Sequence, residues 1–287
     1  MYPKTTLHAL PRIAERWSFV YVEAARIERS DYAVVAERKD GIVRLPIAQF
    51  VCILAGPGTS LTHAAAQLLA ERGCAIIWCG ESAVRYYGTA LPETHMTSHL
   101  EAQARAWALP QERLAVAKAM YRMRFPSDDI DGVKSVEQLR GYEGVHMRSL
   151  YATMATQYGL SWSGKSADPD ERAWDDPLQE AIRVANSCLY GVCQSVIVAI
   201  GMSPALGFVH AGNQRSFVWD VADLYKAQIT LPIAYALAAE GGESVAQRTR
   251  RACRDTFAQQ QLLRHIVPDI LRLFALPEPS IQYESIA

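Results

Sequence analysis

The sequence predicts an α+β fold: a small N-terminal β-sheet domain with one helix, followed by a larger all-helical domain. From Trp17 to about Ala90 the apolar residues alternate mostly with a period of two, and β-branched and aromatic residues are frequent. Beyond about residue 92, strand signals nearly vanish and helical stretches follow one another. We therefore expect a β-rich domain at residues 1–91, a linker at 92–98 and a helical domain at 99–287.

The β-rich domain is expected to contain strands at residues 19–22, 32–35, 42–45, 50–54 and 75–78. Asp40-Gly41, between two of these strands, is a dipeptide typical of a type I′ hairpin turn. One helix at 60–72, ended by Gly73, interrupts the strands.

The helical domain is expected to contain helices at 98–109, 110–124, 135–158, 177–201, 216–239, 245–266 and 268–276. Two of them carry start signals. Ser135 and Gln138 form a capping box, and Asp176-Pro177 places a hydrogen-bond acceptor at the N-cap and a proline after it.

The charge is balanced, with 29 Lys and Arg against 30 Asp and Glu, so a nucleic-acid surface must be a local patch. Arg outnumbers Lys by 23 to 6, which suits phosphate binding but is also typical of GC-rich coding. With a mean hydropathy of -0.03, the composition excludes collagen-like, coiled-coil and low-complexity classes.

The six cysteines lie in apolar stretches, which predicts buried free thiols and favours a reducing cytoplasm. Their spacing does not suit zinc. The most apolar long run, residues 178–202, contains polar residues such as Arg183 and Asn186, so we expect a buried helix rather than a membrane span.

Glu143 lies between Gly141 and Gly144 within the helix expected at 135–158. Each glycine inside a helix costs about 1 kcal/mol relative to Ala, which predicts that another backbone approaches here. Glu143 is then either a functional acid on an approached surface or an ordinary solvated acid.

His210 lies in a loop between Gly207 and Gly212, where two helices meet. It is either a ligand or a hydrogen-bonded structural histidine. Asp220, Asp223 and Lys226 follow on one face of the next helix. They form either a hard-cation site with a phosphate-holding cation or an ordinary intrahelical salt bridge.

One face of the helix expected at 245–266 is basic and consists of Arg248, Arg250, Arg251 and Arg254. Such a face suits a phosphate backbone, the acidic surface of a partner or simple solvation equally well. Gly56-Pro-Gly58 lacks the Lys-Ser or Lys-Thr of a phosphate-binding loop and predicts a turn.

Four motifs, in order, resemble the CRISPR-associated integrase of the spacer-acquisition module, closest to its subtype I-E branch. They are Leu139-Arg-Gly-Tyr-Glu143-Gly, Ser187-Cys-Leu-Tyr-Gly191, Gly207-Phe-Val-His210-Ala-Gly and Ser216-Phe-Val-Trp-Asp220-Val-Ala-Asp223. The likeness spans nearly the whole chain, and the family's small β domain and helical domain match the division made above.

The resemblance implies that Glu143, His210 and Asp223 are the catalytic residues and the ligands of Mg²⁺ or Mn²⁺. Asp220 corresponds to a second acid near the site, and Tyr190 to a motif tyrosine with a supporting role. The candidate DNA-binding residues are Arg85, Arg140, Arg148, Lys226, Arg248 and Arg250.

The implied activity is that of a metal-dependent DNA endonuclease and integrase. The 3′-hydroxyl of a short double-stranded DNA fragment attacks a phosphodiester at the leader-repeat end of a CRISPR array. The implied assembly is a homodimer flanking a smaller CRISPR-associated partner, in a complex of four integrase and two partner subunits.

Two alternatives remain. One is a DNA-binding scaffold of the same fold without turnover, whose acids form only salt bridges. The other is an unrelated metal-dependent hydrolase of small phosphates, which the lack of a phosphate-cradling glycine loop disfavours.

Overall fold

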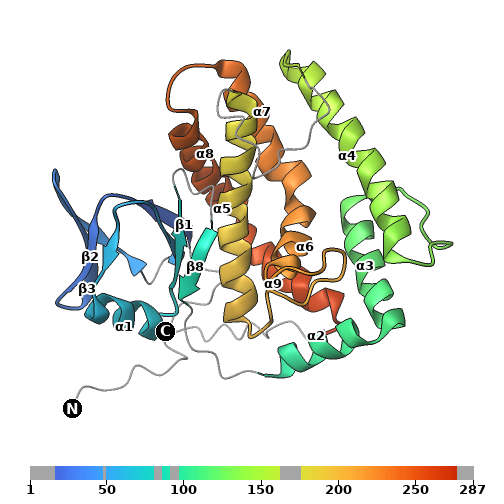
Figure 1. Ribbon diagram of the computed structural model, residues 1–287, viewed down its shortest axis with the longest axis horizontal. Coiled ribbons are helices and arrows are strands. Elements are labelled where there is room, and N and C mark those ends of the chain that lie inside the picture. Colours follow the sequence, from blue (N-terminus) through green and yellow to red (C-terminus); the bar gives the residue numbers. More distant parts are fainter. Residues whose placement is uncertain (1–16, 48–49, 81–85, 91–96, 162–175, 277–287) are drawn as a thin grey trace, which may run out of the picture.

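The computed structural model describes residues 17–47, 50–80, 86–90, 97–161 and 176–276. Within these ranges the strands all lie before residue 91 and the long helices after residue 97, so the order of elements agrees with the α+β prediction (Figure 1). Most of the predicted linker at 92–98 lies outside the described residues, and the domain boundary stays a prediction.

The N-terminal part contains two four-stranded sheets rather than one. The first has the order β1-β5-β7-β8; its strands are β1 (Trp17–Val22), β5 (Phe50–Ala55), β7 (Ala75–Cys79) and β8 (Tyr86–Ala90). The pairs β1-β5 and β5-β7 are parallel, and β8 is antiparallel to β7. The second sheet has the order β4-β3-β2-β6; its strands are β2 (Arg26–Ser30), β3 (Ala33–Arg38), β4 (Gly41–Leu45) and β6 (Ser60–Leu61).

The first sheet is buried on both faces. Cys52 and Leu54 on one face of β5 belong to the core of the helical part, whereas Ile53 and Ala55 on the other face pack with the second sheet and α1 (His63–Glu71). A strand covered on both faces has a continuous apolar sequence, which accounts for the run Phe50-Val-Cys-Ile-Leu54.

The helices of the C-terminal part surround α5 (Pro177–Ala199), which lies at the centre of the molecule in Figure 1. The others are α2 (Ser98–Ala108), α3 (Pro110–Arg124), α4 (Val136–Tyr158), α6 (Ser216–Tyr225), α7 (Leu231–Glu240), α8 (Val245–Gln259) and α9 (Leu262–Leu273). By length and composition α5 could cross a membrane, but 78% of its most apolar window is buried inside the protein. This agrees with the prediction of a buried core helix.

Close packing of α5 on the first sheet depends on Gly191. A Cβ atom at this position would lie 2.8 Å from Leu54 Cδ2 and 3.5 Å from Ile77 Cδ1. A side chain at Gly191 would therefore displace the end of the Leu54 side chain from its present position.

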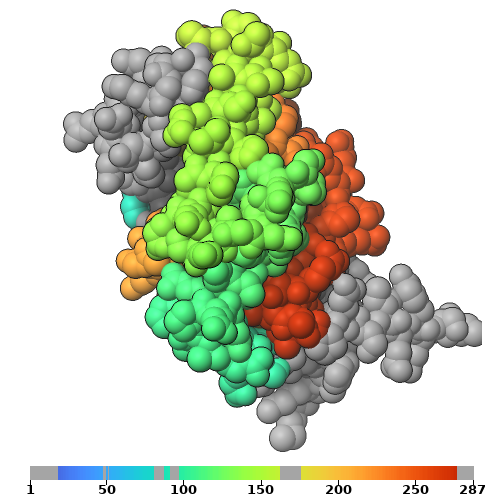
Figure 2. Space-filling view, turned by 90° about the vertical axis from the view of Figure 1, so that its right-hand side faces the viewer, coloured from blue at the N-terminus to red at the C-terminus, as the bar shows by residue number. Residues whose placement is uncertain are grey.

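Figure 2 shows the face of the molecule formed largely by α2, α3 and α4, with α9 at its side. On α4, a Cβ atom at Gly141 would meet nothing within 4 Å, and one at Gly144 only Arg148 Nη1 at 3.5 Å. The expected close approach of another backbone is therefore wrong for the described chain.

Two predicted boundaries are also wrong. The hairpin turn consists of Lys39 and Asp40, one residue earlier than expected. Gly41 is already the first residue of β4 and pairs with Arg38 of β3. The last two helices are divided at Gln261, which has a φ of 50°, whereas Pro268 lies inside α9.

The helix expected at 216–239 is interrupted by a π-helical segment, η5 (Lys226–Thr230), between α6 and α7. Pro232 follows this segment in the first turn of α7. Proline has no N–H and its ring clashes with the carbonyl four residues earlier, so a wider turn before it removes this conflict.

Candidate active site

The His210 loop connects α5 to α6 and is anchored at both ends of its Gly207-Phe-Val-His motif. Gly207 is sterically required, because a Cβ atom there would lie 2.5 Å from His210 O and 2.6 Å from Ser216 Cβ. Phe208 is fully buried, with its ring edge-on to those of Phe217 and Phe274 at centroid distances of 5.9 and 5.3 Å. The glycine and the phenylalanine thus fix the backbone that carries His210.

The buried carboxylate of Asp220, on α6, organises this loop. It accepts hydrogen bonds from the backbone N–H groups of Phe208, Val209 and His210 at 2.5, 3.1 and 2.8 Å. It also lies 2.7 Å from Nδ1 of the His210 ring. Four donors converge on one carboxylate, so Asp220 is a positioning residue for the loop and the ring.

The contact with Asp220 leaves Nε2 of His210 directed toward Asp223, at 3.9 Å from Asp223 Oδ2. This separation is too long for a hydrogen bond. A histidine that is held through one nitrogen by a carboxylate and presents the other is the arrangement found in metal-ligating histidines. Burial lowers the pKa of His210, but the hydrogen bond that its ring donates to Asp220 and the charge of Asp223 outweigh it and raise that pKa above its usual value.

Asp223 lies one turn after Asp220 on α6, and its Oδ1 is 2.6 Å from Lys226 Nζ in the π segment. Burial raises the pKa of Asp223, but the charges of Lys226, Arg124 and His210 together lower it below the usual value. Asp223 is therefore a buried carboxylate, only 10% exposed in its side chain, that stays ionised through its cationic neighbours.

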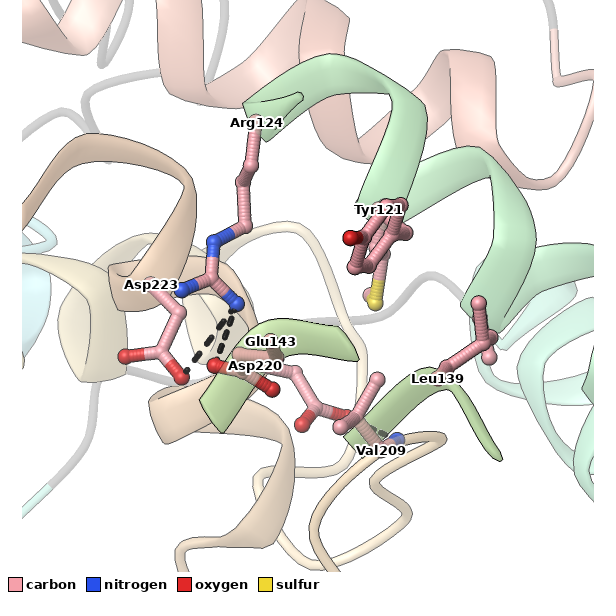
Figure 3. Close-up of a pocket in the computed structure, with 9 residues that line it drawn as sticks. Tyr121, Arg124, Leu139, Glu143, Val209, Asp220 and Asp223 are labelled. Atoms are coloured by element: carbon pink, nitrogen blue, oxygen red, sulfur yellow. Dashed lines mark hydrogen bonds and ion pairs between the residues drawn. The ribbon is translucent and has the colours of Figure 1, made fainter. Parts of the chain in front are cut away.

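Glu143 on α4 faces the same place from the opposite side. Its Oε1 is 2.6 Å from Nη1 of Arg124, the last residue of α3, and the same Nη1 is 3.9 Å from Asp223 Oδ2 (Figure 3). The two acids therefore share one guanidinium nitrogen. Arg124, Glu143, Asp220 and Asp223 line a common pocket.

Side chains of the three predicted ligands thus approach one pocket, although they are far apart in the sequence. Among the described residues, no three Asp, Glu, His or Cys side chains form a ready-made metal site, since Arg124 lies between Glu143 and Asp223. The donor set of two carboxylates and one imidazole fits Mg²⁺ or Mn²⁺. The ligand roles themselves stay predictions.

Tyr190 on α5 contacts two cations: Lys226 Nζ lies 4.8 Å from the centroid of its ring and Arg215 Cζ 5.3 Å. Lys226 is therefore held between Asp223 and Tyr190. These contacts place Tyr190 beside the two cations, and its supporting role stays a prediction.

Of the predicted DNA contacts, Arg85 lies outside the described residues. Arg140 and Arg148 are exposed on α4, and Arg140 donates a hydrogen bond to the carbonyl of Val209 in the His210 loop. On α8, Arg248 is bonded to Glu240 and to the carbonyl of Gly241. The Arg250 guanidinium stacks on the Tyr21 ring at 4.2 Å, between the sheet and the helices.

Arg124 was not singled out in the sequence. An arginine in the last turn of a helix is common, because it favours the negative end of the helix dipole. The sequence therefore gives no sign that Arg124 also contacts Glu143 and Asp223, because that contact depends on how α3 packs against α4 and α6.

Comparison with known proteins identifies the family. The family model for CRISPR associated protein Cas1 matches residues 19–126 and 119–243. The chain is 41% identical to CRISPR-associated endonuclease Cas1 of Clostridium sp. (strain SY8519) over 94% of this chain and 90% of that protein. It is 36% identical to the protein of the same name from Escherichia coli (strain K12), over 95% and 89%.

Two solved structures have folds similar to that of this chain. The TtCas1 chain of a TtCas1-DNA complex superimposes with a TM-score of 0.81 at 39% identity, covering 92% of this chain and 94% of that one. A casposase bound to its integration product has a TM-score of 0.73 at 16% identity, which shows a shared fold. On the family match and these identities, the chain belongs to the Cas1 family of CRISPR-associated proteins.

Proposed function

We propose that this protein is a metal-dependent DNA endonuclease and integrase that inserts short DNA fragments as new spacers at the leader-repeat end of a CRISPR array. The observation that carries the proposal is the pocket lined by Glu143 and Asp223, with Nε2 of a histidine that Asp220 orients 3.9 Å from Asp223. The related proteins named endonucleases, and the relative in a DNA complex, support the same function.

In this proposal Glu143, His210 and Asp223 would hold a Mg²⁺ or Mn²⁺ ion. When bound, the ion polarises the phosphate and stabilises negative charge on the attacking or leaving oxygen. Asp220 keeps the His210 ring in position, with Nε2 facing Asp223. Lys226 keeps Asp223 ionised and stands beside the place where a phosphate would bind.

The proposed substrates are double-stranded DNA fragments and leader-repeat DNA. Exposed Arg140 and Arg148 on the same helix as Glu143 are well placed to contact a DNA backbone that reaches the pocket. Contacts by Arg85, Lys226, Arg248 and Arg250 remain part of the proposal. So do the homodimer, the smaller CRISPR-associated partner in a four-plus-two complex, the subtype I-E branch and the cytoplasmic location.

The test is strand transfer of a labelled DNA duplex into a supercoiled plasmid that bears the leader and repeat. Wild type and Asp223→Ala are compared with the partner protein and Mg²⁺ or Mn²⁺. Half-site products from the wild type alone, and only with metal, are expected. Absence of products from a wild type that binds the DNA, with a partner preparation that is active with a control integrase, would contradict the proposal.

A second candidate, a DNA-binding scaffold without turnover, is favoured by one observation: both oxygens of Asp223 already face cations, Lys226 and Arg124. Asp223→Asn separates the two functions. The integrase loses turnover but keeps its DNA affinity, whereas a scaffold has no turnover to lose and keeps its DNA affinity as well.

A further inference from the structure

Arg124 lies where a divalent cation held by Glu143 and Asp223 would have to bind. Its Nη1 lies 2.6 Å from Glu143 Oε1 and 3.9 Å from Asp223 Oδ2, between two of the proposed ligands. The three side chains are only 9%, 18% and 10% exposed, so little water separates these charges. The guanidinium therefore occupies space that a cation bridging the two acids would need.

The charges of the pocket are also nearly balanced without a metal ion. Glu143, Asp220 and Asp223 contribute three negative charges, and Arg124 and Lys226, which pair with Glu143 and Asp223, contribute two positive ones. Adding a divalent cation leaves an excess of positive charge in a poorly solvated place, which is unfavourable. A DNA phosphate brings the negative charge that removes this excess.

The guanidinium is incompletely bonded where it lies. Its Nε is buried and has no hydrogen-bond partner among the described residues. Its Nη2 contacts only a weak acceptor, Met147 Sδ at 3.6 Å. A buried donor without a partner is costly, and a phosphate offers the planar, two-pronged contact that arginine favours. Arg124 thus has a better partner in DNA than in the present pocket.

We propose that Arg124 competes with the divalent cation for Glu143 and Asp223 until a DNA phosphate draws it away, so that metal and DNA bind cooperatively. This inference rests on the proposed function, because it takes Glu143 and Asp223 as metal ligands. Its consequence is that metal binds weakly to the protein without DNA. Cooperativity must be reciprocal: metal tightens DNA binding by the factor by which DNA tightens metal binding.

The experiment measures Mn²⁺ binding by the electron paramagnetic resonance signal of free Mn²⁺, with and without a short duplex. Its 3′ ends are dideoxy, so that it cannot act as the attacking strand. The variant is Arg124→Gln, and the matched control is Arg122→Gln. Arg122 lies two residues earlier on α3, is half-exposed and pairs with Asp131 outside the pocket. Thermal unfolding shows whether each variant is folded.

Without DNA, Arg124→Gln is expected to bind Mn²⁺ about tenfold more tightly than wild type, a factor that corresponds to about 1.4 kcal/mol. Its affinity for Mn²⁺ should then change little when the duplex is added, while wild type and Arg122→Gln bind Mn²⁺ more tightly with DNA. Equal or weaker Mn²⁺ binding by folded Arg124→Gln would overturn the proposal. If that variant does not fold, a wild type whose Mn²⁺ affinity is the same with and without DNA would overturn it.

Glu143→Gln separates this inference from the proposed function. Loss of Mn²⁺ binding in Glu143→Gln supports the metal site whatever Arg124 does. If wild type binds no Mn²⁺ in a Glu143-dependent way even with DNA, the metal site and the inference fail together. If Mn²⁺ binding depends on Glu143 but not on Arg124, the inference alone fails.

Discussion

Asp220 and His210 are joined twice through one oxygen: Oδ1 accepts from the His210 backbone N–H at 2.8 Å and contacts the ring Nδ1 at 2.7 Å. Both the position of the loop and the rotation of the ring are therefore set by one fully buried carboxylate. The sequence resemblance placed Asp220 near the metal as a second acid, but its oxygens are already occupied by loop donors. Asp220 is therefore placed to hold the His210 loop rather than to act as a further ligand of the proposed metal ion.

Asp220→Asn should impair activity through His210 rather than through the metal. An amide has a single acceptor oxygen, so its NH₂ group would face N–H donors of the loop. We expect a loss of about 10- to 100-fold in strand transfer, with unchanged DNA affinity, and a loss of about 1–3 kcal/mol in the free energy of unfolding. Urea unfolding and anisotropy with labelled DNA measure these effects. Asp131→Asn, at an exposed carboxylate, is the control, and full activity of Asp220→Asn would refute the positioning role.

Gly207→Ala and Gly141→Ala should have opposite effects on stability. The added methyl group at Gly207 meets backbone and side-chain atoms at 2.5–2.7 Å, so the His210 loop must shift and the protein is destabilised by more than about 1 kcal/mol. At Gly141 it meets nothing within 4 Å on a helix, where Ala is favoured by about 1 kcal/mol. Thermal unfolding measures both. If Gly141→Ala is more stable but binds DNA less tightly, the backbone that packs closely against Gly141 is that of DNA.

Arg250 and Arg148 should differ in how they affect DNA binding. Arg250→Ala removes the contact between the guanidinium and the Tyr21 ring, so the free energy of unfolding should fall by about 0.5–1 kcal/mol. Arg148→Ala, at an exposed position, should leave stability unchanged and reduce the slope of log affinity against log salt by about 1. DNA binding measured over a salt series tests both. A reduced slope in Arg250→Ala would show that Arg250 also contacts DNA.

The buried thiols should make the protein less stable at high pH. Burial raises the pKa of Cys52 and of Cys79 from 9.0 to about 12. A raised pKa in the folded state means that this state holds the proton more tightly, so the contribution to stability is complete below pH 9 and is lost as pH rises toward 12. Urea unfolding from pH 8 to 10.5 should show the decline. In the Cys52→Ala, Cys79→Ala double variant the free energy of unfolding should decline less steeply with pH. An equally steep decline in both proteins would contradict the role of these thiols.

Much of the fold could be predicted from sequence because its signals are local. Ser135 caps α4 by accepting from the Gln138 N–H, and Asp176 caps α5, as their positions predict. All six cysteines are buried and free, as expected. By contrast β2, with the sequence Arg-Ile-Glu-Arg-Ser, was missed, because only Ile27 is fully buried and the strand is specified by its pairing with β3.

The site was predicted in a different way. No periodicity brings residues 143, 210 and 223 together; the family resemblance did, and the pocket contains Glu143 and Asp223 with His210 beside them. Arg124 could not be predicted, because its contact with Glu143 depends on how two helices pack. Likewise the π segment between α6 and α7 was not predicted, because the sequence favours a continuous helix there.

The double burial of the first sheet has a consequence for how the molecule comes apart. Phe19, Leu54 and Ile77 belong to the same apolar cluster as the helices around α5, and Phe19 touches Phe257 of α8 at 5.9 Å. Separating the sheets from the helices would expose one face of that cluster to water. Although the composition changes near residue 92, the chain should melt as one cooperative unit, and a fragment ending there would expose the apolar face of the first sheet that packs on the helices.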